Sequence, residues 1–328
     1  MDVVSDAIFA AHLGHPRFHR VRTRGNWCAR QDAYEGAGFH VVLKGGCSLL
    51  TDGGTAVSLG VGDAVLLPHG TGHVLADSPV DAAVAARTAV PFTRWLAESE
   101  AEAEAESEAA AESEAAAGPP DREGTELLSG TYWLDCSRTH PLMAELPEVV
   151  RLPARVGGHR ELRAAIDLLA GELDQVRPGS CMALPNLLDL LLVYMIRAWM
   201  EKSEGGRWPG ALGDPVTAAA LRAMHSHPAA RWSNDLLAAE AGVSRPTLAR
   251  RFTARVGRPP MAYLTWWRVV LAAGMLRDTT QTLAAIAGRV GYGSPYALSH
   301  AFTREFGVTP GRYRARAAER SASAAGSR

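Results

Sequence analysis

The sequence of 328 residues lacks the features of several protein classes. Its four cysteines lie far apart and form no C-x-x-C pair, which argues against a disulfide scaffold or a zinc cluster and favours a reduced, cytoplasmic setting. No apolar run reaches the roughly 18 residues of a membrane-spanning helix. The densest run, 184–200, is interrupted by Pro185, Asn186, Asp189 and Arg197. The N-terminus has no basic region before an apolar one, so we expect no signal peptide and no membrane contact.

Lysine is missing from the last third of the chain, yet this region is strongly basic. From Ala211 onward there are 16 arginines and 6 acidic residues, a balance of +10, and the net charge of −1 therefore leaves −11 for the rest of the chain. Such an asymmetry indicates a basic part that faces nucleic acid, joined to a part with another role.

Short apolar runs separated by glycine-rich turns fill residues 16–91, and this spacing is typical of an antiparallel sandwich or barrel. Residues 97–120 then form an acidic, low-complexity insert that cannot bury a core. We expect it to be a solvated linker, although a frayed helix also fits its composition. The strand pattern resumes at Glu126 and predicts a return to the same barrel.

Apolar residues recur at helical spacing from His159, which predicts a helical linker over residues 156–210. The apolar second helix of this linker, 184–200, has two interpretations. Packing against the first helix is the simpler one, and a homodimer seam is the alternative. We expect residues 317–328 to be a disordered tail.

A sequence of about fifty residues is repeated near the C-terminus. "LARRFTARVGRPPMAY" begins at Leu248 and "LSHAFTREFGVTPGRY" begins at Leu298. Each copy follows a short apolar helix, a glycine turn and an N-capping serine, Ser244 in the first copy and Ser294 in the second. This pattern predicts two helix-turn-helix units, at about 233–254 and 282–305.

The repeat resembles the AraC/XylS family of bacterial transcription regulators over about residues 214–316. The motifs that carry the resemblance are "AGVS", "RRF", "YLTWWR" and "VGY.S….AF.REFG.TP..YR". The resemblance implies an all-α DNA-binding domain at 211–316, in which one helix, about 261–277, joins two DNA-reading units. The second helix of each unit would enter the major groove of double-stranded DNA at a bipartite promoter site.

The outward positions of these two helices are the expected DNA-binding residues. They are Arg245, Thr247, Arg250 and Arg251 in the first unit, and Tyr296, Ser299, His300 and Arg304 in the second. Arg250 matches the usual contact position of the family, and an arginine there bridges a guanine edge or a phosphate. The family commonly has arginine where this chain has His300, which weakens the expected electrostatic contribution of the second unit. For any single arginine, a solvated surface charge is the alternative interpretation.

The stretch "GDAVLLPHGTGHVLAD", from Gly62, fits the second motif of a cupin barrel, with Asp77 in place of asparagine. Residues 1–155 thus resemble the cupin domain of AraC-family regulators, which binds an effector. The first cupin motif has lost its metal ligands, because Gly38 stands at the glutamate position and Asp32-Ala33-Tyr34 at the H-x-H position. An open catalytic site needs about three protein ligands, so we expect no catalytic residue, no metal and no cofactor.

Two histidines remain candidates for the effector site. His73 belongs to the cupin motif, and strand alternation predicts that His40 also faces the barrel interior. The two could meet in one pocket and contact the effector, or both could be buried structural histidines. With Cys28 or Cys47 nearby they could also bind a metal, although no spacing requires it.

Together these features predict an α+β multidomain protein: a cupin-like antiparallel β-barrel, a helical linker and a C-terminal tandem helix-turn-helix domain. The predicted function is a cytoplasmic, DNA-binding transcription regulator controlled by a small molecule. The family resemblance favours activation, with RNA polymerase as a further partner and a homodimer as the assembly. Two alternatives stay open, namely a redox or electrophile sensor that uses the cysteines, and a metal-dependent cupin enzyme joined to a DNA-binding module.

Overall fold

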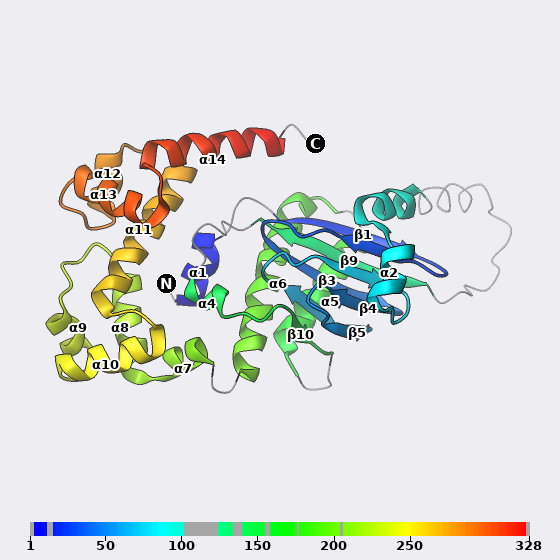
Figure 1. The fold of residues 1–328 in the computed structure, drawn as a ribbon, viewed down its shortest axis with the longest axis horizontal. Coiled ribbons are helices and arrows are strands. Elements are labelled where there is room, and N and C mark those ends of the chain that lie inside the picture. The colour runs from blue at the N-terminus through cyan, green and yellow to red at the C-terminus, as the bar shows by residue number, and fades with distance from the viewer. Residues whose placement is uncertain are drawn as a thin grey trace. The chain divides into compact units, whose positions relative to one another are not determined.

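The computed structural model describes residues 3–11, 16–101, 124–133, 140–154, 158–175, 177–203 and 206–325. The chain forms two compact units (Figure 1). One contains 12–136 and 146–202, and the other contains 1–11, 137–145 and 203–328. This division differs from the sequence-based one, which assigns residues 1–155 to a single domain. The difference arises because two short segments pack against the C-terminal helices.

The first unit is built on two five-stranded sheets. The order in one sheet is β1-β9-β3-β6-β10 and in the other β5-β4-β7-β2-β8. The strands are β1 (Arg17–Thr23), β2 (Cys28–Gln31), β3 (Ala37–Lys44), β4 (Gly46–Thr51), β5 (Ala56–Gly60), β6 (Ala64–Leu67), β7 (His73–Ala76), β8 (Val90–Pro91), β9 (Thr125–Tyr132) and β10 (Val150–Leu152). Strand β9 pairs antiparallel with both β1 and β3, so the chain does return to the same sheet after the acidic insert.

The interior of this unit is filled with side chains from both sheets. Val42, Val65 and Leu127 of the first sheet pack with Leu49 and Leu75 of the second. A helical stretch, residues 92–101, adds Phe92, Trp95 and Leu96 to this core, and Trp95 stacks on Trp27 with ring centroids 4.8 Å apart. The chain is therefore helical up to residue 101, inside the segment where we expected a solvated linker. The rest of the insert, 102–123, lies outside the described residues.

The other helices that the structure describes in the sheet unit are α2 (Ala82–Thr88), α5 (Arg160–Asp174) and α6 (Ser180–Lys202). Helices α5 and α6 pack against each other, and the Tyr132 hydroxyl of β9 donates a hydrogen bond to the Leu188 carbonyl of α6 at 2.7 Å. By length and composition alone α6 would suffice to cross a membrane, and it is the one helix among the described residues that would. It also packs against α5.

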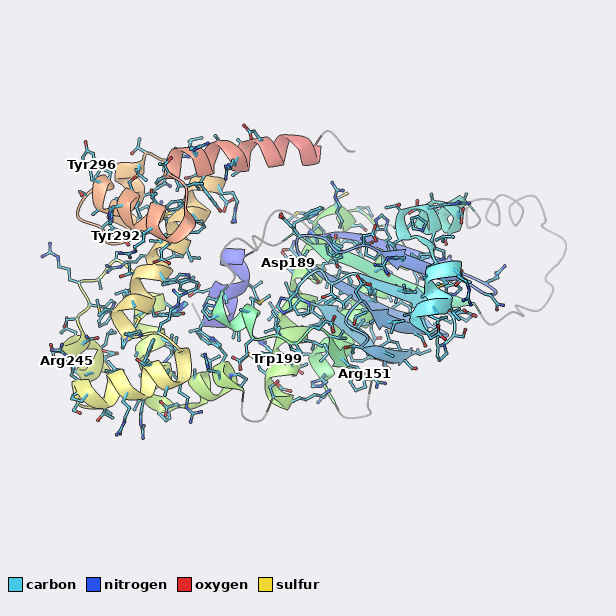
Figure 2. All side chains as sticks on the ribbon, viewed as in Figure 1. Arg151, Asp189, Trp199, Arg245, Tyr292 and Tyr296 are labelled. Atoms are coloured by element: carbon cyan, nitrogen blue, oxygen red, sulfur yellow. The ribbon has the colours of Figure 1, made fainter. Side chains whose placement is uncertain are left out.

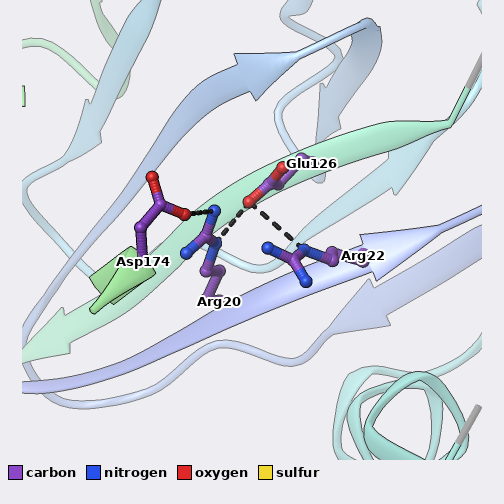
Figure 3. A network of polar contacts seen from close by, with 4 residues as sticks. All are labelled: Arg20, Arg22, Glu126 and Asp174. Carbon is purple, nitrogen blue, oxygen red and sulfur yellow. Dashed lines mark hydrogen bonds and ion pairs between the residues drawn. The ribbon is translucent and has the colours of Figure 1, made fainter. Parts of the chain in front are cut away.

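A network of four charged side chains ties the end of α5 to the sheet (Figure 3). Arg20 of β1 donates through Nε to Glu126 of β9 and through Nη2 to Asp174 of α5, the latter at 2.6 Å. Arg22 approaches the same Glu126 oxygen at 3.5 Å. Arg20 and Glu126 are mostly shielded from water, so this network resists screening better than a surface ion pair does.

The other unit is entirely helical where the structure describes it. Its helices are α1 (Val3–Ala11), α4 (Pro141–Ala144), α7 (Arg207–Gly213), α8 (Pro215–Ser226), α9 (Asn234–Glu240), α10 (Arg245–Val256), α11 (Pro260–Asp278), α12 (Leu283–Arg289), α13 (Pro295–Phe306) and α14 (Pro310–Ala325). The pairs α9–α10 and α12–α13 lie close to the bounds predicted for the two helix-turn-helix units, and α11 joins them (Figure 1).

The C-terminus differs from the expected disordered tail. Helix α14 continues to Ala325, and Tyr313 and Ala317, four residues apart on one face, are buried. Tyr313 packs against Phe302 and Phe306 of α13. This apolar contact holds the start of a helix whose remaining sequence is polar, which a reading of composition alone overlooks.

Candidate functional site

The first recognition helix, α10, presents its predicted residues away from the core. Leu248 and Phe252, four residues apart, are fully buried and fix the orientation of the helix on α8 and α9. Arg245, Arg250 and Arg251 are exposed. The helix begins at its N-cap, Ser244, and ends at Gly257, whose φ of 80° is left-handed and favours glycine. The structure therefore leaves the three predicted arginines exposed on α10, outside the stripe that Leu248 and Phe252 bury.

The arginines of α10 differ in their partners. Arg251 lies 3.5 Å from Asp214, and Arg245 lies 3.9 Å from Asp235. Thr247 is half-buried and shares a hydrogen bond of 2.9 Å with the hydroxyl of Ser244. Arg250 forms no ion pair with any residue that the structure describes. Of this set, Arg250 is the cation most available to an incoming anion.

The second recognition helix, α13, repeats this architecture with a different surface. Ser294 caps it by accepting a hydrogen bond from the Ala297 amide at 3.2 Å, and Leu298 and Phe302 are fully buried. Its outward residues are Tyr296, Ser299, His300 and Arg304. Tyr296 is 86% exposed. A large aromatic side chain that is left in water marks a candidate contact surface. Arg245 and Tyr296 both lie on the outside of their helices in Figure 2.

Two further arginines stabilise the two helix-turn-helix units, and no sequence motif pointed to them. Arg268 of α11 donates to the carbonyls of Pro228 and Ala230, both at 2.7 Å. Arg314 of α14 donates to the carbonyls of Leu276 and Gln281. Each arginine joins two backbone carbonyls of a loop or a helix end, and the Ala230 carbonyl also accepts from the Trp232 amide at 2.8 Å. They stabilise the loops that flank α9 and α12, so they act on DNA reading only through the fold.

Inside the sheet unit, His40 of β3 and His73 of β7 do meet. Their Nε2 atoms lie 2.9 Å apart, and both side chains are almost fully buried. His73 Nδ1 donates to the Thr71 carbonyl at 2.8 Å, which leaves its Nε2 as the acceptor for His40 Nε2–H. His40 Nδ1 then accepts from the Ser129 hydroxyl at 2.8 Å. Burial lowers the pKa of both imidazoles, and for His40 the neighbouring His73 lowers it further, so the pair is neutral.

The residues around this pair do not fit a cupin metal centre. A Cβ at Gly38, the expected glutamate position, would overlap the hydroxyl oxygen of Tyr34, so a tyrosine occupies the space of the missing ligand. All four ring nitrogens of His40 and His73 already have hydrogen-bond partners. Among the described residues no cluster of three His, Cys, Asp or Glu side chains could hold a metal ion. We derive no metal chemistry from this site.

A cavity of about 530 Å³ lies elsewhere in the sheet unit. It is bounded by the turn at Gly62, by Leu152–Ala154 and by the first turns of α5, where Arg160 and Arg163 line it. Neither His40 nor His73 lines this cavity. The two candidate effector residues thus lie in the filled core of the barrel, whereas the described hollow lies at its outer edge.

The cysteines are dispersed in the structure as well as in the sequence. Cys47 is buried in the barrel core, and burial raises the pKa of its thiol to about 12. Cys28 is half-buried and Cys181, near the start of α6, is exposed. Cys136 lies outside the described residues. A buried thiol that stays protonated is a poor nucleophile, so Cys47 does not favour the redox-sensing alternative.

Comparison with known proteins finds a separate match in each part of the chain. A cupin family model matches residues 2–201, and a helix-turn-helix domain model matches residues 237–316. An AraC-like transcription regulator of Streptomyces lividans is 36% identical over 88% of this chain and 90% of its own length. The regulator AlkR of Acinetobacter baylyi is 25% identical over 96% of this chain and 99% of its own. Among solved structures, the DNA-binding domain of AdpA with a target DNA is 34% identical over 33% of this chain and 96% of that chain, with a TM-score of 0.32.

Proposed function

Because this chain belongs to the AraC-like transcription regulators that carry an N-terminal cupin domain, we propose that α10 and α13 read the two halves of a bipartite DNA site with unequal strength. The residues in contact with DNA are Arg245, Thr247, Arg250, Arg251, Tyr296, Ser299, His300 and Arg304. The observation that carries the proposal is the exposure of six of these side chains, on two helices that buried Leu–Phe pairs hold against the core. Thr247 and Ser299 are half-buried beside them.

The two units differ in the kind of contact they offer. Helix α10 carries three exposed arginines, which suit phosphates and guanine edges. Helix α13 carries Tyr296 and His300 at its exposed start, together with Arg304, which lies 3.6 Å from Glu305. The first unit therefore supplies most of the salt-dependent affinity, and the second contributes through shape and apolar contact, such as that of the Tyr296 ring with a thymine methyl group.

We propose that the barrel binds a small-molecule effector and that His40 and His73 contact it. In the structure they contact each other, so an effector has to enter beside them and replace the bond between the two rings. The helical residues 92–101 pack over this core, and the buried Trp95 indole nitrogen has no hydrogen-bond partner in the described structure. Movement of this helix would open the pair to a ligand. In cells, His73→Leu should remove the effector-dependent part of transcription. The purified variant should still bind the DNA site.

The assembly and setting follow from the same assignment. Helices α5 and α6 expose Leu168, Met182 and Leu190, and we propose that this face joins two copies into a homodimer. A protein that reads DNA and activates a promoter works in the cytoplasm, with RNA polymerase as a further partner. It acts by binding and not as an enzyme, so no cofactor is needed.

Arg250→Ala tests the proposed DNA reading. A 40-base-pair duplex is first selected from random sequence by the full-length protein. If Arg250 reads a base, its loss should cost about 1–3 kcal/mol of binding and relax selectivity at one position. Arg94→Ala, which removes an exposed arginine of the sheet unit, is the matched control. Equal affinities for the two variants would contradict the assignment of Arg250.

A further inference from the structure

Two short segments outside the helix-turn-helix units belong to the DNA-reading unit. They are residues 3–11, which form α1, and residues 140–145, which include α4. In the chain they lie on either side of the barrel strands β1 to β9. The helix-turn-helix family model begins only at residue 237, and both segments lie within the match to the cupin family model, residues 2–201.

A line of buried hydrogen bonds joins these segments to the reading helices. Asp6 of α1 lies 2.8 Å from His225 Nδ1 on α8, and His225 Nε2 lies 2.8 Å from the Tyr263 hydroxyl on α11. The same hydroxyl lies 3.3 Å from Nε2 of His140, the N-cap of α4. All four side chains are at most 5% exposed.

The partners fix the direction of every bond in this line. The Leu142 amide donates to His140 Nδ1 at 3.1 Å, so the His140 proton sits on Nε2 and is donated to the Tyr263 oxygen. The Tyr263 hydroxyl in turn donates to His225 Nε2, and His225 Nδ1–H donates to the Asp6 carboxylate. Burial lowers the pKa of His140 and raises that of Tyr263, which keeps both groups neutral. Loss of any one member leaves buried polar neighbours without partners, which is costly.

Packing adds to these bonds. Trp267 of α11 stacks on His225 with ring centroids 4.3 Å apart, and Trp208 of α7 lies 5.0 Å from the His140 ring. At the end of the second segment, Glu145 accepts hydrogen bonds from the backbone amides of Arg207 and Trp208, which begin α7. The carboxylate thus caps α7, and a negative charge at a helix N-terminus is favourable.

Both segments connect to the same end of two paired strands. Helix α1 leads into β1 at Arg17, and Arg17 is paired with Thr131, next to the last residue of β9, from which the chain runs on to residue 140. Ser129 of β9 is the residue that hydrogen-bonds His40 in the barrel core. The histidine pair is therefore hydrogen-bonded to the strand that continues into the second segment.

The two segments leave the DNA-reading surface uncovered. With both of them in place, Arg245, Arg250 and Arg251 of α10 remain exposed. The hydrogen-bond partners named above lie on α7, α8 and the first half of α11, and both α7 and α8 pack against the recognition helix α10 of the first unit. Their engagement is therefore compatible with DNA binding, and it acts by ordering the first unit.

We propose that residues 3–11 and 140–145 form a clamp, held by the Asp6–His225–Tyr263–His140 hydrogen bonds, that positions the first helix-turn-helix unit and transmits the state of the barrel to it. The proposal rests on the proposed DNA reading. It assigns the four residues a positioning role, since none of them belongs to the expected DNA contacts.

Tyr263→Phe tests the clamp, because it removes the central hydroxyl and keeps the ring. Tyr292→Phe is the matched control, since the buried Tyr292 hydroxyl has no hydrogen-bond partner among the described residues. On the selected duplex we expect Tyr263→Phe to weaken binding of the full-length protein at least fivefold, within the half-site that Arg250→Ala weakens. The control should stay within twofold of the wild type. Whether the wild type binds the selected duplex tests the proposed DNA reading on its own, separately from the clamp.

Reciprocity separates positioning from a merely structural role. If the engaged clamp raises DNA affinity, DNA must stabilise the clamp by the same factor. Hydrogen exchange in residues 3–11 should therefore slow on DNA binding by the factor that Tyr263→Phe costs in affinity. Unchanged exchange there, or equal binding by the two phenylalanine variants, would overturn the proposal. If Tyr263→Phe does not fold, Asp6→Asn decides by the same two measurements, with a smaller expected loss because an amide oxygen still accepts from His225.

Discussion

Acidification should destabilise the barrel through His40 and His73. Both are buried and neutral, and burial lowers their pKa values in the folded chain, whereas an unfolded histidine titrates near 6.5. Below about pH 6.5 the unfolded chain thus binds protons that the folded chain excludes. Stability then rises with pH and is lost as the pH falls through this window. Each histidine contributes at most about 1.4 kcal/mol per pH unit, or about 2.7 kcal/mol for the pair.

The slope is the change in the free energy of unfolding with pH. It is measured by urea unfolding at several pH values between 7.5 and 5, with hydrogen exchange in β3 and β7 as the readout, so that only the sheet unit is followed. The double variant His40→Leu/His73→Leu should lose most of the dependence on pH, whatever its absolute stability. His19→Gln, which changes a more exposed histidine of the same unit, should keep the wild-type slope. Equal slopes in the wild type and the double variant would show that the pair is protonated or exposed, and would refute the description of the barrel core.

Three other outcomes follow from the packing. Gly38→Ala should destabilise the sheet unit by about 1–3 kcal/mol through overlap with the Tyr34 hydroxyl, and adding Tyr34→Phe should restore part of the loss in urea unfolding. If Tyr34→Phe restored no stability, a group other than the Tyr34 hydroxyl would have to occupy the space beside Gly38. At pH 8 a thiol reagent followed by mass spectrometry should label the exposed Cys181 and spare the buried Cys47 until the chain unfolds. Phe252→Ala should cost the helical unit about 3–5 kcal/mol and leave exchange in the barrel unchanged, since its ring is fully buried under α10.

Local sequence signals were sufficient for the helix-turn-helix units. Leu248 and Phe252, and their counterparts Leu298 and Phe302, mark the buried stripe at helical spacing, and the glycine after each recognition helix is left-handed as a helix end requires. The strand alternation likewise predicted that His40 and His73 would face the same interior, and they lie in hydrogen-bond contact. The regular spacing of apolar residues thus predicts which face of a helix or strand is buried.

The clamp was beyond the reach of the sequence. Asp6, His140 and His225 are far apart in the chain, and none of them stands in a motif, so only the three-dimensional packing of unrelated segments reveals their connection. The same reason explains why a solvated linker was preferred for the start of the acidic insert and a disordered tail for the C-terminus, since a few apolar contacts, those of Phe92, Trp95 and Leu96 and of Tyr313, hold these otherwise polar helices. The Tyr34 hydroxyl that fills the space beside Gly38 is likewise a result of three-dimensional packing, which no sequence pattern marks.

Hydroxyl-radical footprinting of the full-length protein on its selected duplex tests the central claim most directly. Two recognition helices joined by α11, which spans about 28 Å at 1.5 Å per residue, should protect two zones about one helical turn, or roughly 34 Å, apart on one face of the DNA. The account predicts that Arg250→Ala weakens protection in one zone and Tyr296→Ala in the other. A single continuous zone that forms equally on any sequence would contradict it.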